Sequence, residues 1–177
     1  MDRKYRIVYW LAALLYAICL GITLLSLKAL PPQVACHFNQ AGQPDNWTSA
    51  QVVAGVFCGV YTVMFLVFTV LPRFAGKLPA RWISVPHAEY WLSECRRPSL
   101  DRKMQRLAAE MGVGILAFLL SVELLTIRAN LSEPVQLNQN LFYLVLGLFI
   151  LFLTFWLTRL FRSFEVPAKA GRESGDD

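Results

Sequence analysis

Charged residues are scarce in this chain of 177 residues, at 16% of the sequence. The runs 7–27, 52–71 and 141–158 contain no Asp, Glu, Lys or Arg, and the run 111–127 contains one acid, Glu123. A helix needs about 20 apolar residues to cross the roughly 30 Å hydrocarbon core of a bilayer. Four such runs exclude a soluble globular domain. They predict an all-α integral membrane protein, a bundle of four spanning helices.

Catalytic motifs are absent as well. The sequence has no GxSxG, no HExxH, no phosphate-binding glycine loop and no CxxC pair. Its two histidines, His37 and His87, fall on opposite sides of the predicted membrane, so they cannot bind one metal ion together. We therefore predict no enzymatic activity, no cofactor and no metal. An outer-face hydrolase or metal-binding protein built on His37, Asp45 and Glu123 remains the less favoured alternative, because these ligands are too few for a structural zinc site.

Basic residues outnumber acidic ones by five, yet no separate basic domain exists to bind nucleic acid. Cationic flanks that face anionic lipid headgroups account for the surplus, so the bilayer is the predicted partner. The four cysteines are scattered: Cys19 and Cys58 fall within spans, Cys95 on the cytoplasmic side and Cys36 in an outer loop. No disulfide is expected.

The distribution of the basic residues predicts the orientation. Lys28 lies in the first connection between spans and Arg128 in the third; all other Lys and Arg residues lie before the first span, in the second connection or after the last span. Because cytoplasmic loops carry the excess of Lys and Arg, both termini are expected in the cytoplasm. The predicted units are 1–73, two helices with an outer loop; 74–110, a basic cytoplasmic connection; 111–163, a second helix hairpin; and 164–177, a disordered tail.

Two patterns predict how these units pack. Ala13, Ala17 and Gly21 recur every four residues in the first span, and Gly55 and Gly59 form a similar pair in the second; small residues at this spacing let membrane helices approach closely. In the cytoplasmic connection, Leu100, Met104, Leu107 and Met111 line one face of an expected helix that begins near Ser99. That pattern predicts a short amphipathic helix lying on the inner membrane surface.

The outer loop contains the most specific pattern, Pro31-x₅-His37-Phe-Asn39-x-x-Gly42-x-Pro44-Asp45-x-Trp47. Pro31 and Pro32 end the first helix, Asn39 and Gly42 suit a turn, and Thr48 is the expected cap of the second helix. The residues left over as candidates for binding a ligand or partner are His37, Asn39, Asp45 and Trp47. Glu123 joins them, because an acid within the membrane is a candidate functional site; His37 and Arg128 are its expected partners.

This loop and its flanking spans resemble the small bacterial membrane domain of unknown function at the N-terminus of SdpI-type proteins. The resemblance covers the first span through the second and implies a location in the bacterial cytoplasmic membrane. In SdpI-type proteins it implies immunity to a secreted toxic peptide and signalling by sequestering a repressor. Two functions are therefore carried forward: a small receptor or immunity-type protein whose outer loop recognises a peptide or partner, and an accessory subunit of a larger membrane complex.

Overall fold

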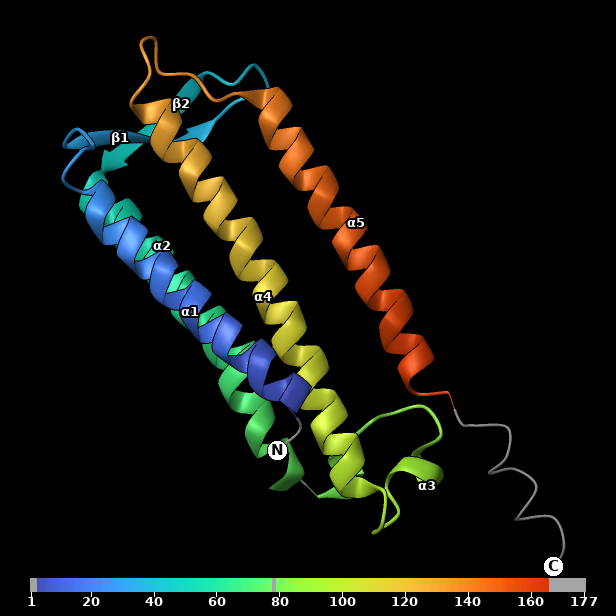
Figure 1. Cartoon of the computed structure of the whole chain (residues 1–177). Helices are drawn as coiled ribbons and strands as arrows, with labels where there is room; N and C mark the ends of the chain where they lie inside the picture. Colours follow the sequence, from blue (N-terminus) through green and yellow to red (C-terminus); the bar gives the residue numbers. More distant parts are fainter. Residues whose placement is uncertain (1–2, 78, 166–177) are drawn as a thin grey trace, which may run out of the picture.

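Four long helices dominate the computed structural model, which describes residues 3–77 and 79–165 (Figure 1). All four are long and apolar enough to cross a membrane, which confirms the predicted all-α membrane bundle. Helix α1 begins and helix α5 ends at the same end of the bundle. The long helices are α1 (Arg3–Ser26), α2 (Ala50–Phe65), α4 (Arg97–Asn130) and α5 (Gln139–Ser163).

The connection between α1 and α2, predicted as a loop with a turn at Gly42, is a β-hairpin. Strand β1 (Gln33–Phe38) pairs antiparallel with β2 (Pro44–Ser49) and lies across the ends of the helices (Figure 1). The predicted cap of α2 is also one residue off: Ser49 Oγ accepts from the Val52 amide at 3.3 Å, while Thr48 pairs with Val34 in the sheet. Because Thr48 belongs to strand β2, the hydroxyl of the following residue, Ser49, caps the helix.

Helix α2 changes its winding before it ends. It continues as a π-helix, η1 (Leu66–Val70), and then as a 3₁₀-helix, η2 (Leu71–Lys77). Pro72 explains the change, because its ring has no N–H to donate and would clash with the carbonyl four residues earlier in a regular α-helix.

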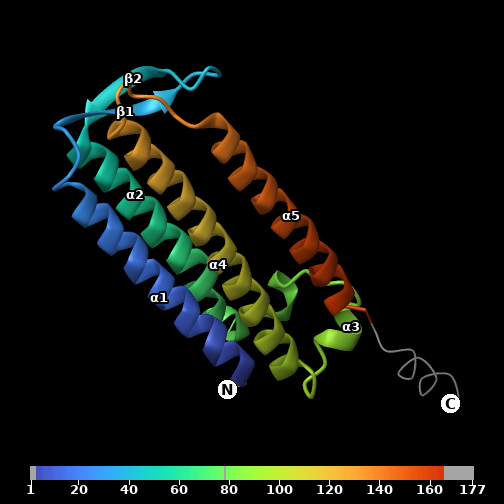
Figure 2. The ribbon, with the colours of Figure 1, turned by 45° about the horizontal axis from the view of Figure 1, so that its top comes forward.

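Helices α1, α2 and α4 form the packed core. Cys19, Tyr61 and Leu116, one from each helix, are fully buried against one another, and Tyr16 stacks on Phe65 with ring centroids 4.5 Å apart. Helix α5 instead runs beside α4 on the side away from α1 and α2 (Figure 2). None of the residues of α5 is buried. The bundle is therefore three packed helices with a fourth alongside.

Among residues 3–77 and 79–165, the small residues of the predicted pattern do not lie at the packed centre of the bundle. The buried positions of α1 are Ala12, Cys19 and Thr23, whereas Ala17 is exposed and Ala13 and Gly21 are half-buried. Gly55 and Gly59 are exposed, and a Cβ added at Gly21, Gly55 or Gly59 would have no neighbour within 4 Å. The four-residue spacing of small residues therefore marks a helix face other than the one that packs in the core, where larger side chains such as Tyr61 and Leu116 lie.

The connection between α2 and α4 also differs from the prediction. The amphipathic segment is not a separate surface helix but the beginning of α4, which runs unbroken for 34 residues, so the expected boundary at residue 110 falls inside a helix. Its apolar residues Leu100 and Leu107 are buried against Trp91 of the short helix α3 (Ala88–Trp91) and against Phe164. The amphipathic pattern was real, but protein rather than lipid covers its apolar face.

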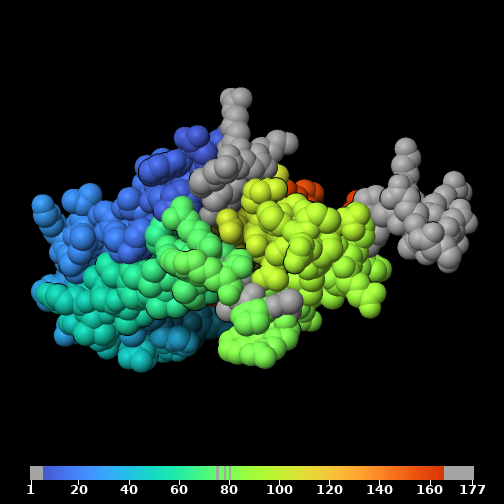
Figure 3. All heavy atoms as spheres, turned by 90° about the horizontal axis from the view of Figure 1, so that it is seen from below, coloured from blue at the N-terminus to red at the C-terminus, as the bar shows by residue number. Residues whose placement is uncertain are grey.

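This end of the molecule is built from the remaining short elements. Besides α3, the connection contains a 3₁₀-helix, η3 (Ala80–Trp82), and Figure 3 shows its residues, in green, beside the start of α4 in yellow-green. Trp91 Nε1 donates to the Phe164 carbonyl at 3.1 Å. Phe164, expected in a disordered tail, is therefore part of the packed structure. Residues 166–177 of that expected tail lie outside the described residues.

Candidate functional site at the hairpin end

The tip of the hairpin is held by the connection between α4 and α5. The Leu137 amide donates to the Gly42 carbonyl at 2.9 Å, and the Gln136 and Gln139 side-chain amides donate to the carbonyls of Ala41 and Gln40. Gly42 has a φ of +73°, and a Cβ there would lie 2.5 Å from the Leu137 carbonyl oxygen. Both the backbone conformation and the close approach require glycine.

Asn39, a predicted binding residue, is occupied by the turn. Its Oδ1 accepts from the Ala41 amide at 2.8 Å and from the Gln43 amide at 3.0 Å. The Asn39 amide in turn donates to the Gln43 carbonyl at 2.9 Å. Asn39 therefore shapes the turn, and its acceptor oxygen is not available to a ligand.

The base of the hairpin is held by Asn130 near the end of α4. The buried Asn130 side chain accepts from the Ala35 amide at 2.6 Å and donates to the Ala35 carbonyl at 3.0 Å. Its amide thus pairs with the edge of β1 as a neighbouring strand would. The sequence analysis missed Asn130, because an Asn near the end of a helix usually indicates only a helix terminus.

His37 and Asp45 are brought together by the pairing of the two strands. His37 Nδ1 lies 2.5 Å from Asp45 Oδ1, and the two side chains are 68% and 42% exposed. Trp47, two residues further along β2, is 47% exposed. All three members of the sequence pattern are exposed on the hairpin, His37 the most. Asn39 and Gly42, by contrast, are needed to form the turn and to attach it to the connection between α4 and α5.

The backbone of β2 leaves one edge of the sheet open. Ala35 lies opposite Trp47, and because both backbone groups of Ala35 bond to Asn130, they point away from β2. Opposite residues of an antiparallel pair share this orientation, so the N–H and C=O of Trp47 point away from β1. In the described part of the chain, no group outside the two strands bonds to the N–H or C=O of Trp47. One edge is therefore closed by Asn130, and the other is available.

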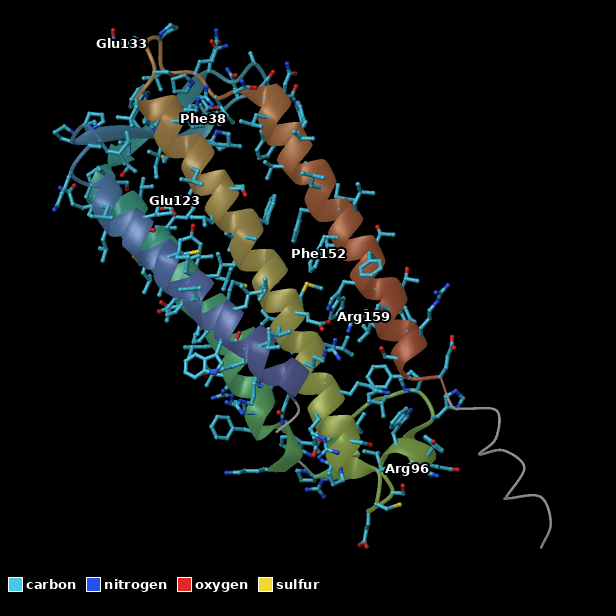
Figure 4. All side chains as sticks on the ribbon, viewed as in Figure 1. Phe38, Arg96, Glu123, Glu133, Phe152 and Arg159 are labelled. Atoms are coloured by element: carbon cyan, nitrogen blue, oxygen red, sulfur yellow. The ribbon has the colours of Figure 1, made fainter. Side chains whose placement is uncertain are left out.

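Glu123 lies below the hairpin, on the side of α4 that faces α1 and α2 (Figure 4). The residue is 3% exposed, and its Oε2 accepts from the Tyr61 hydroxyl at 2.7 Å. The expected partners were His37 and Arg128, so the structure corrects that prediction. The sequence analysis missed Tyr61, which is fully buried in the core, because 62 residues separate it from Glu123 and no local pattern links the two.

A cavity of about 10 Å³, room for one water molecule at most, separates this buried acid from the underside of β1. Glu123, Thr126 and Asn130 of α4 line it, together with Val34 of the hairpin. Glu123 therefore belongs to a buried polar layer that supports the hairpin and is separate from the exposed His37–Asp45 pair.

The side chains that could bind a metal ion are spread over the structure. Among residues 3–77 and 79–165, no group of three or more His, Cys, Asp and Glu side chains is placed to hold a metal ion. Cys36 neighbours His37 in the sequence, but its thiol donates to the Asn46 carbonyl at 3.5 Å.

Residues 14–62 match the model of a family described as Domain of unknown function (DUF1648). The match spans most of α1, the whole hairpin and most of α2, less than a third of the chain. It supports the predicted resemblance of the paired-helix unit to a domain of unknown function. No curated protein and no solved structure matches the chain.

Proposed function

We propose that this membrane protein is a recognition protein whose hairpin binds an extended peptide segment on the outer face of the membrane. The observation that carries the proposal is the open edge of β2, beside which Trp47, His37 and Asp45 are exposed. An extended peptide adds to such an edge through main-chain hydrogen bonds, while side chains beside the edge select its sequence. Trp47 is suited to anchor it, because tryptophan is enriched where binding energy concentrates.

The rigid attachment of the hairpin supports the same function. Asn130 holds its base on α4, and Gly42 holds its tip near the start of α5. A binding edge that is ordered before the peptide arrives loses less conformational entropy on binding. Immunity to a secreted peptide or signalling across the membrane would be uses of this same recognition.

The experiment is a screen of a random peptide library against the purified protein in detergent, followed by binding of enriched peptides to variants. Trp47→Pro removes the one outward N–H that we assign to the open edge, and an edge strand tolerates proline. We expect binding to fall at least tenfold in Trp47→Pro and to remain in Trp82→Ala, which alters a still more exposed tryptophan at the opposite end. Peptides that bind Trp47→Pro as well as the original protein would refute the proposed edge.

The outward orientation of the hairpin is part of the proposal and has its own test. Cys36 is exposed on the hairpin and Cys95 is exposed at the opposite end, while Cys19 is buried. A membrane-impermeant maleimide added to intact cells should label Cys36, and it should label Cys95 only after the membrane is opened. Labelling of Cys95 alone in intact cells would place the hairpin in the cytoplasm and overturn the proposal. A Cys58→Ser background removes the half-buried thiol of α2.

A second candidate is an accessory subunit that packs against another membrane protein. The favouring observation is that Ala17, Gly55 and Gly59 are exposed on α1 and α2. Small residues on an open helix face suit close contact with a helix of another chain. Bulky substitutions such as Gly55→Leu with Gly59→Leu should then release a copurifying membrane protein without lowering the thermal stability of this chain. Peptide binding at β2 would survive those substitutions.

A further inference from the structure

A polar pocket lies at the hairpin end, between α4 and α5 rather than along the sheet edge. Its volume is about 490 Å³, within the range of small-molecule sites. Arg128 and Ala129 of α4 form one wall, Asn140 of α5 forms another, and Ala41 of the hairpin tip borders it. The connection between α4 and α5 supplies most of the remaining lining. Three separate segments of the chain therefore converge on this space.

Most polar side chains of the pocket are already committed to the protein. The side chain of Gln136 donates to the Ala41 carbonyl, that of Gln139 donates to the Gln40 carbonyl, and Asn138 Oδ1 accepts from the Leu141 amide. The Ser132 hydroxyl donates to the Ala129 carbonyl at 2.8 Å. These bonds fix the side chains that build the pocket.

Arg128 and Asn140 are different, because their side chains have no hydrogen bond or ion pair within the described ranges 3–77 and 79–165. The acid that also borders the pocket, Glu133, lies at the outermost bend of the connection (Figure 4) and forms no ion pair with Arg128. Among the lining residues Arg128 is the only cation. Its planar guanidinium matches a carboxylate with two parallel hydrogen bonds.

We propose that this pocket binds a carboxylate with an amide group beside it, the chemistry of an acylated amino acid or of the last residue of a peptide. Arg128 holds the carboxylate, and the Asn140 side chain pairs with the amide. Binding here does not use the β2 edge, since none of the residues of β2 lines the pocket. A ligand in the pocket would touch α4, α5 and the hairpin tip at once, and would thereby join α5 to the packed core.

The test uses N-acetylglycine as the probe and N-acetylglycinamide, its uncharged analogue, as the matched ligand, with binding to the purified full chain measured by saturation-transfer NMR or calorimetry. We expect the acid to bind at least tenfold more tightly than the amide. Arg128→Gln should weaken binding of the acid at least tenfold and leave the amide unchanged. Lys28→Gln, the matched control at the other basic residue of this end, should change neither.

Further arms separate this proposal from folding effects and from the function proposed above. Arg128→Lys preserves the charge and, if the chain folds, should bind the acid with intermediate affinity, whereas Trp47→Pro should bind it normally. A short peptide with a free C-terminus, compared with its amidated form, shows whether the natural carboxylate is a peptide terminus. Equal binding of acid and amide, or unaltered binding in Arg128→Gln, would overturn the proposal. So would displacement of the acid by tenfold less glycerol 3-phosphate, which would assign Arg128 to lipid headgroups.

Discussion

Helix α4 has two contrasting faces. Toward α1 and α2 it is closely packed: Leu116 is fully buried with Cys19 and Tyr61, and Glu123 bonds to Tyr61. Toward α5 it is open, with cavities of about 270 Å³ and 340 Å³ along the contact. The chain is therefore not two equivalent helix hairpins. Helix α4 belongs structurally with the two helices of the matched domain, and α5 is an addition to them.

The contact with α5 depends on its ends. At the hairpin end, the connection bonds to Gly42; at the other, Arg159 pairs with Glu110 at 2.7 Å and Trp156 Nε1 donates to the Leu107 carbonyl at 3.1 Å. Between these points the contact is mainly aromatic, including Phe118 stacked on Phe149 with centroids 4.3 Å apart. In a bilayer, where lipid is as apolar as these side chains, such a contact adds little driving force.

The largest effect is expected where the hairpin joins the two parts. Gly42→Ala places a Cβ against the Leu137 carbonyl at a positive φ, and strain and overpacking together should cost about 2–5 kcal/mol. The melting temperature in detergent measures this cost, and hydrogen exchange should show faster exchange of the Leu137 amide. Gly55→Ala, with open space around it, is the control. A Gly42→Ala protein as stable as that control would show that the hairpin tip does not join α5 to the bundle.

The next largest loss of stability is expected at Asn130, which attaches the hairpin to α4. Asn130→Ala leaves the buried amide and carbonyl of Ala35 without their partner, at an expected cost of about 1–3 kcal/mol. Hydrogen exchange at Ala35 should quicken more than exchange in the middle of α2. The matched substitution is Asn140→Ala, which removes an exposed amide from the open side and should leave stability unchanged. Unaltered protection at Ala35 in Asn130→Ala would contradict the anchoring role.

Substitutions at two glycines of α4, one on each face, compare how tightly the two faces are packed. A Cβ at Gly112 would lie 2.9 Å from Phe68 Cβ in η1, and one at Gly114 would meet the ring of Phe152 on α5. Figure 4 shows Phe152 on the side of α5 that faces α4. Gly112→Ala should cost about 1–3 kcal/mol by overpacking, whereas Gly114→Ala should cost about 1 kcal/mol less because a ring on a loosely held helix can move. Both changes raise helix propensity equally, so that gain cancels in the comparison.

The measurement is the difference in unfolding free energy between these two variants. A smaller cost at Gly114 supports the contrast between the two faces of α4. A larger cost at Gly114 than at Gly112 would mean that α5 is packed as firmly as the core, and the contrast between the two faces would be lost.

The smallest effect concerns Glu123. Tyr61→Phe removes its hydrogen bond, and hydrogen bonds between membrane helices are worth about 0.6 kcal/mol on average and up to about 1.7. Glu123→Gln retains an oxygen that accepts from Tyr61, so its cost should be lower than that of Glu123→Leu. A double-mutant cycle of Tyr61→Phe with Glu123→Leu measures the coupling. No coupling energy would indicate that the bond does not stabilise the closed face of α4.

Particular residues show how far the sequence could reach. Scarcity of charge located the four spans, because a charged side chain in hydrocarbon is costly wherever the helix packs. The pairing of His37 with Asp45 was within reach as a possibility, since the two residues flank the same turn. Asn39 looked equally able to bind a ligand, yet its side-chain oxygen accepts hydrogen bonds from backbone amides of the turn. Which side chains bond to the backbone depends on the conformation of the turn, which the sequence does not specify.

The sequence by itself determined the spans, the distribution of basic residues between the two ends and the presence of an ordered segment between the first two spans with a turn at Gly42. These follow from properties of single residues and neighbours: transfer free energy, charge and backbone conformation. Only the tertiary structure decided that α4 packs with α1 and α2, that Tyr61 meets Glu123, and that Asn130 closes one edge of the hairpin and leaves the other open. Those pairs are separated by 62 and 95 residues. Their meeting depends on how each helix is rotated about its own axis, and in a uniformly apolar helix hydrophobicity alone does not set that rotation.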